Sequence, residues 1–104
     1  MNIEKRFYDS EDLDKKYGKL SVGAFLRAWR LSEGWSQKIF ARKLKISAAN
    51  LCDIEKGRKG VSVEKAQGIA KAIGYPPTVL VQMALQDEVS SAGLKYSVRV
   101  KSAA

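Results

Sequence analysis

Four serines, each just before an apolar repeat of helical spacing, divide most of this chain into short segments. A serine hydroxyl at a helix N-cap accepts a hydrogen bond from a free backbone N–H of the first turn. Glycines end two of the segments, as expected for helix C-termini. The pattern therefore predicts four short helices, the first running from its cap to about Glu33, with only a few residues between the first three. The four caps are Ser21, Ser36, Ser47 and Ser62, and the two terminators are Gly34 and Gly74.

The segment after residues 75–77, "YPP", predicts a fifth helix. Proline is well placed in a first helical turn, and "TVLVQMALQ" follows it. This helix is apolar on nearly every side, so we expect a second face of it to meet another subunit. The whole is an all-α domain over residues 21–87. Residues 1–20 form an N-terminal arm with one short helix in "SEDLDKKYG", which either covers an edge of the core or binds a partner.

Residues 88–104 form a tail in which the pattern changes to period two. "LKYSVRV" alternates apolar with polar side chains, which predicts a short β-strand over residues 94–100. A lone strand needs a partner for its backbone. Three partners remain open: the same strand of a second subunit, the N-terminal "NIEKRFY", or a binding protein. The apolar side chains that would face the partner or core are Leu94, Tyr96, Val98 and Val100.

Charge and composition favour some classes of function over others. The net charge is +8, and residues 21–60 carry most of it, which favours a polyanionic partner such as nucleic acid or an acidic membrane surface. The chain has no histidine and a single cysteine, Cys52, so most catalytic templates and mixed zinc sites lack a required part. We therefore expect no enzyme activity, no cofactor and no metal. No apolar run could span a bilayer and the N-terminus does not resemble a signal peptide, which predicts a cytoplasmic protein without a membrane partner.

Two charged residues near the apolar stripes suggest an ion pair. Glu55 lies one turn beyond Leu51 on the side expected to be buried, where an unpaired charge is costly. Arg30 lies one turn beyond Leu26 on the first helix and is similarly placed. We therefore expect Arg30 and Glu55 to pair and tie the first helix to the third.

Residues 26–74, "LRAWRLSEGWSQKIFARKLKISAANLCDIEKGRKGVSVEKAQGIAKAIG", resemble the helix-turn-helix domain of the Cro/phage-repressor type, also called the xenobiotic-response-element (XRE) family. The ordered set of matching positions carries the resemblance, from Arg30 and "SQ" at 36–37 through "IE" at 54–55 and "GR" at 57–58 to Gly74. It implies a five-helix, lambda-repressor-like bundle in which helix 47–56 lies in the DNA major groove. It also implies the Arg30–Glu55 pair. One departure is Lys45, which stands where the family has glycine; a left-handed lysine costs about 1 kcal/mol.

The resemblance also implies roles for individual residues. Gln37 would contact a phosphate at the start of its helix. Asn50 can bond adenine in bidentate fashion, and an alanine can only touch a thymine methyl. Asp53 either accepts from cytosine, or only repels wrong sites or caps a lysine. The lysines and arginine at 42, 43 and 45 either contact phosphates or form a solvated face. The expected base contacts are Ala48, Ala49, Asn50 and Asp53; the expected phosphate contacts are Gln37, Lys56, Arg58 and Lys59.

The function that this resemblance implies is a sequence-specific, homodimeric repressor bound to a double-stranded DNA operator. Small members of the family are often antitoxins, those of the HigA kind among them, which repress their own operon and hold a toxin; this is the first alternative. A protein scaffold or coactivator with non-specific nucleic-acid binding is the second. Binding to random duplex DNA would separate the scaffold from the repressor.

Overall fold

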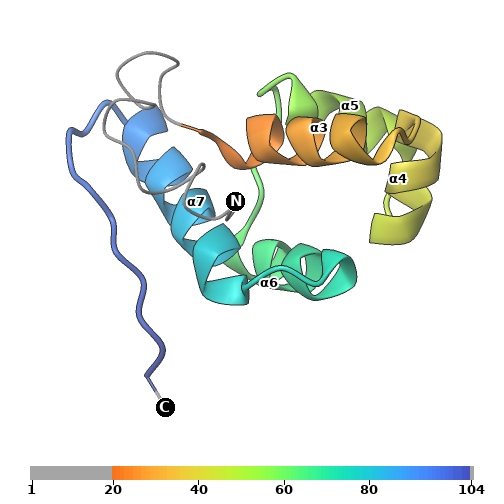
Figure 1. Cartoon of the computed structure of the whole chain (residues 1–104). Coiled ribbons are helices and arrows are strands. Elements are labelled where there is room, and N and C mark those ends of the chain that lie inside the picture. The colour runs from red at the N-terminus through yellow and green to blue at the C-terminus, as the bar shows by residue number, and fades with distance from the viewer. Residues whose placement is uncertain (1–19, 104) are drawn as a thin grey trace.

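Five α-helices make up the part of the chain that the computed structural model describes, residues 20–103 (Figure 1). They are α3 (Val22–Glu33), α4 (Gln37–Leu44), α5 (Ala48–Glu55), α6 (Val63–Ile73) and α7 (Pro77–Ser91). The helix expected in the N-terminal arm lies outside the described residues. Among the described helices none has the length and apolar character needed to cross a membrane.

Local capping chemistry sets where four of the helices begin. Each predicted serine sits in extended backbone, and its hydroxyl accepts a hydrogen bond of 3.0–3.1 Å from the backbone N–H three residues later. Gly34 and Gly74 end α3 and α6 with φ angles of 72° and 74°, in the left-handed region that glycine adopts at little cost. Proline opens α7 without a side-chain cap. The predicted helix starts are therefore confirmed.

The core lies where α3 bridges α5 and α7, with α4 packed on α5 and α6 on α7. Its fully buried large side chains come from every helix except α6, which contributes alanines and one isoleucine. Tyr75 joins it from the α6–α7 turn: its ring centroid lies 5.0 Å from that of Phe25 and 5.6 Å from that of Trp29. These large buried side chains are Val22, Phe25, Leu26, Phe40, Leu51, Ile54 and Leu80.

Gly23 allows α3 to cross α5 closely. A Cβ atom at this position would fall on the carbonyl oxygen of Ile54, near the end of α5. Only glycine fits where two backbones approach so tightly. This contact fixes the angle at which α5 leaves the core.

The tail does not form the predicted strand. Residues 94–103 are extended but pair with no other strand among the described residues, and they run alongside α7 (Figure 1). Side-chain amides of Gln82 and Gln86 on α7 bond their backbone instead. Part of the α7 surface that we expected to meet another subunit is thus occupied by the chain's own tail.

Candidate nucleic-acid interface

A buried carboxylate joins α3, α4 and α5. Arg30 binds Glu55 through two parallel bonds, Nε to Oε2 at 2.8 Å and Nη2 to Oε1 at 2.9 Å. Gln37 donates a third bond to Oε1 at 3.1 Å, and Arg30 Nη1 also donates to the carbonyl of Trp35 at 3.1 Å. The side chains of Arg30 and Glu55 are 13% and 2% exposed. The structure therefore brings the two residues of the expected ion pair together, and it adds Gln37 to them.

The protonation of this cluster follows from its contacts. Burial alone would raise the pKa of Glu55, but the hydrogen bonds from Arg30 and Gln37 outweigh burial, and the net pKa is lowered. The hydrogen bond to Glu55 raises the pKa of Arg30, against the opposing effect of burial. Both groups are charged at neutral pH, so a charge-assisted pair fixes α5 relative to α3 and α4.

The face of α5 opposite the core presents small and polar side chains. Ala49 is exposed, while Ala48, Asn50 and Asp53 are half-buried. The Asn50 side-chain oxygen Oδ1 is buried and has no hydrogen-bond partner among the described residues.

The exit from α5 is basic and tied back to the helix. The carbonyl of Asp53 accepts from the backbone N–H of Arg58 at 2.8 Å and from that of Lys59 at 3.3 Å. The Asp53 carboxylate also lies 3.6 Å from Arg58 Nη1 in an exposed ion pair. Lys56, Arg58 and Lys59 are all exposed. Asp53 thus meets a cation of its own chain, an arginine and not the lysine considered from the sequence, and its carbonyl ties the basic turn to the end of α5.

The remaining basic side chains of this region belong to α4 and the turn that follows it. Arg42, Lys43 and Lys45 are exposed on and just after α4, and the Lys43 ammonium lies 4.7 Å from the centre of the Trp35 ring. Lys45 adopts the left-handed conformation (φ 59°, ψ 41°) considered above. Trp35 packs against Phe40 with ring centroids 5.6 Å apart, so it supports the core rather than standing free for a base.

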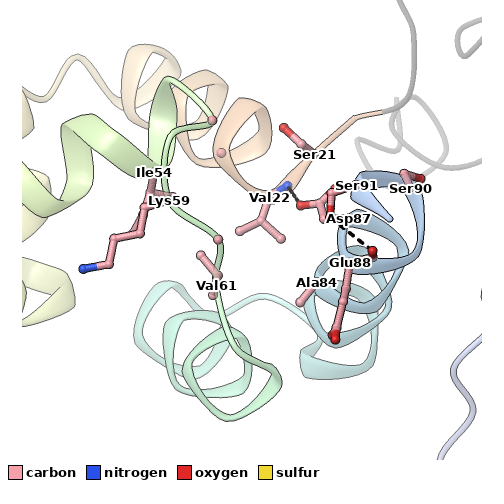
Figure 2. A pocket seen from close by; sticks show the side chains of 13 residues that line it. Ser21, Val22, Ile54, Lys59, Val61, Ala84, Asp87, Glu88, Ser90 and Ser91 are labelled. Carbon is pink, nitrogen blue, oxygen red and sulfur yellow. Dashed lines mark hydrogen bonds between the residues drawn. The ribbon is translucent and has the colours of Figure 1, made fainter. Parts of the chain in front are cut away.

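A hollow lies between the start of α3, the α5–α6 turn and the end of α7, and Lys59 of the basic turn forms part of its lining (Figure 2). Its volume is about 670 Å³. On its wall Asp87 accepts a hydrogen bond of 2.9 Å from the backbone N–H of Val22 and so ties α7 to the start of α3. Burial raises the pKa of Asp87, and this hydrogen bond only partly opposes the rise. No group of side chains suited to hold a metal ion occurs among residues 20–103.

The order of the helices and the small-faced α5 with a basic exit match a known family. A family model for the helix-turn-helix domain aligns with residues 26–80, just over half of the chain. The chain belongs to the XRE-type helix-turn-helix family. The described part of the chain has the all-α architecture expected of such a domain. Members of this family are DNA-binding transcription regulators. No curated protein matches the chain.

Membership of the helix-turn-helix family assigns DNA as a partner, but it does not by itself assign individual contacts. Of the four residues expected at base edges, Ala49 is exposed, and Ala48, Asn50 and Asp53 are half-buried. The amide nitrogen of Gln37 donates to Glu55. A DNA phosphate near Gln37 would therefore meet the backbone N–H groups at the start of α4.

Two residues that sequence reasoning missed position the helices relative to one another. Gly23 allows the close crossing of α3 and α5, and a glycine in the first turn after a serine cap was the available signal. Asp87 anchors α7 to the start of α3, and the sequence gives no comparable signal for it, because Gln86 and Glu88 flank it.

Proposed function

We propose that this protein is a cytoplasmic, sequence-specific repressor that binds its operator as a homodimer, with α5 in the major groove. The observation that carries the proposal is the two-sided character of α5. Leu51, Ile54 and Glu55 hold its inner side. Its other side is narrow, begins with Ala49 and ends in the exposed basic turn 56–59. A helix with small side chains fits closely into the major groove while flanking cations meet the phosphates.

The chemistry of this face allows little direct reading of bases. The alanines can contact only a thymine methyl, and Asn50 offers a donor, which suits a purine N7 or another groove acceptor. For the bidentate adenine contact expected of Asn50, the side chain would have to turn, because its Oδ1 is buried in the chain without DNA. Phosphate contacts therefore supply much of the affinity, and binding weakens steeply with salt.

Pairing of two protomers would supply the specificity that a single α5 lacks. One α5 reads only one half-site, and two related helices one turn of DNA apart read a palindrome. On α7, Leu85 and Val89 are only half-buried and lie outside the buried core, which leaves apolar surface for a second copy. Light scattering of the protein on its operator should give two chains per duplex.

Selection of binding sites from random DNA tests the proposal. We expect a conserved site of two half-sites. Asn50→Ala should change base preference within each half-site, whereas Arg58→Ala should weaken binding to all sequences and reduce the salt slope by about one unit. Lys71→Ala, which removes an exposed charge from α6, is the matched control and should bind as the unmodified protein does. Equal affinity for all duplexes would contradict the repressor and favour the scaffold alternative.

The antitoxin alternative is supported by the tail, which lies outside the matched residues 26–80 and leaves backbone groups available to a protein. In that case the same α5 would repress the operon while another surface holds a toxin. A short reading frame adjacent to the gene, whose product co-purifies in fixed stoichiometry and loses toxicity on binding, would favour it. A product that binds but keeps its activity would argue against it.

A further inference from the structure

Among the described residues, the hydrogen-bond partners of the extended tail lie along one of its edges. Gln86 donates from Nε2 to the carbonyl of Tyr96 at 2.8 Å and accepts at Oε1 from the N–H of Val98 at 2.8 Å. Gln82 accepts from the N–H of Val100 at 2.9 Å. Two glutamine side chains on α7 thus occupy the place that a neighbouring strand takes in a sheet.

The opposite edge of the tail is open within residues 20–103. In extended backbone, the N–H and C=O of one residue point to the same edge, and those of successive residues to opposite edges. Because residues 96, 98 and 100 face the glutamines, the backbone groups of residues 95, 97, 99 and 101 face away from them. None of these four makes a hydrogen bond to another described residue. Such an edge is a template for one more strand.

The side chains beside this edge specify what kind of strand fits. Lys95, Arg99 and Lys101 project from one face of the tail and are exposed. Leu94 and Tyr96 project from the other face and are 49% and 66% exposed. Side chains directly opposite in paired strands stabilise the pair when their charges are complementary. We propose that residues 94–101 bind an extended segment of a partner protein in which acidic and apolar side chains alternate.

A second copy of this chain fits the edge poorly. In the two antiparallel registers that pair most of residues 94–101 with themselves, Lys95 faces either Arg99 or Lys101 of the other copy. Like charges directly opposite each other destabilise a strand pair. Charge complementarity therefore selects a partner with acidic side chains over self-pairing, which the sequence alone left open.

DNA is the other polyanion that a basic tail attracts, but its position argues against the same duplex. In Figure 1 the tail descends on the side of α7 away from α3, α4 and α5. A duplex held by α5 would lie at the opposite side of the protomer. The inference concerns the tail alone and does not depend on the proposed repressor function.

Amide hydrogen exchange of the full chain, followed by NMR, tests this proposal. The probe is an eight-residue peptide in which glutamate alternates with valine. We expect it to slow exchange of the Ser97 and Arg99 amides at least tenfold, with little change at Val98 and Val100. A peptide of the same composition with its order scrambled, and the alternating peptide with lysine for glutamate, should give no such protection. Arg99→Glu should weaken binding of the acidic peptide at least tenfold.

Several outcomes would overturn the proposal. Equal protection by the scrambled peptide would mean that charge alone attracts it. Protection of Ser97 and Arg99 in the protein alone would mean that the edge is already filled, by a second copy if the effect grows with protein concentration and by the N-terminal arm if it does not. Duplex DNA protecting the same amides would assign the edge to nucleic acid.

Discussion

At the scale of single residues, the decisive contact is a carboxylate that three helices share. Glu55 accepts from Arg30 and Gln37 while its side chain is 2% exposed. A buried ion pair of this kind contributes less through net attraction than through the penalty for leaving one partner alone. Its structural effect is to hold α5 at a fixed angle to α3 and α4.

Replacement Glu55→Gln should therefore destabilise the fold by about 3 kcal/mol, because Arg30 keeps its charge and loses its partner. The pKa of Glu55 is lowered in the folded state, so its contribution is present above the unfolded value near 4.3 and is lost as the pH falls through the lower folded value. Urea denaturation between about pH 2 and pH 7 measures both effects. Glu64→Gln, at an exposed position of α6, should change the free energy of unfolding little. If Glu64→Gln destabilises the fold as much as Glu55→Gln, the effect at Glu55 does not come from its buried ion pair.

At Lys45, in the turn after α4, we expect a substitution that stabilises the fold. Its φ of 59° is costly for a residue with a Cβ, so Lys45→Gly should raise the free energy of unfolding by about 1 kcal/mol. Lys65→Gly, inside α6, should lower it by a similar amount because glycine weakens a helix interior. Thermal unfolding of the two variants gives the comparison, and a shift of the same sign in both would contradict the account.

At the scale of elements, the sequence predicts where helices start, because each start depends on residues of one turn. It does not predict how helices cross, because a crossing depends on residues far apart in the chain. The serine caps predict where α3 to α6 begin, since each cap needs only residues within the same turn. The crossing of α3 and α5 depends on Gly23 and on a carbonyl thirty-one positions away. The tail is a similar case: alternation predicts its extended form, but it does not indicate that Gln82 and Gln86 of α7 bind its backbone.

Gly23→Ala should destabilise the fold by about 1–3 kcal/mol or more, because the added methyl must displace backbone rather than a flexible side chain. Gly68→Ala is the control in a helix where nothing lies within 4 Å of the added carbon. It should stabilise by about 0.5–1 kcal/mol. Guanidinium unfolding distinguishes the two; a harmless Gly23→Ala would mean that α3 and α5 can separate freely.

Asp87→Asn tests the tie between α7 and α3. Burial raises the pKa of Asp87, so the folded state favours the protonated acid, and its contribution falls as the pH rises from near 3.9 through the higher folded value. The asparagine keeps an oxygen to accept from Val22 and has no charge to bury. We expect the variant to lose this pH slope and to match or exceed the original stability at pH 7. Glu88→Gln, exposed on the same helix, should leave the change of stability with pH intact. If Asp87→Asn keeps the same change of stability with pH, Asp87 is not its cause.

At the scale of the whole molecule, the chain separates two surfaces. Helices α4 and α5 lie on the side of α7 away from the tail, and the tail runs along the other side of α7 (Figure 1). For the first surface, on α4 and α5, the family pattern and the charge concentration coincide in the sequence, and its individual DNA contacts stay predictions. Sequence predicts the second surface, the tail, poorly, because the pairing of a strand depends on what lies beside it.

The most direct test of the central claim, that the outer face of α5 enters the major groove, is a comparison of operator affinity between Ala49→Glu and Ala72→Glu. Both replace an exposed helical alanine by the same acid, one on α5 and one on α6. The account predicts that Ala49→Glu weakens binding about 100-fold or more, because the carboxylate meets phosphates and base edges, while Ala72→Glu binds within a few fold of the unmodified protein. Equal affinity of the two folded variants for the operator would contradict it.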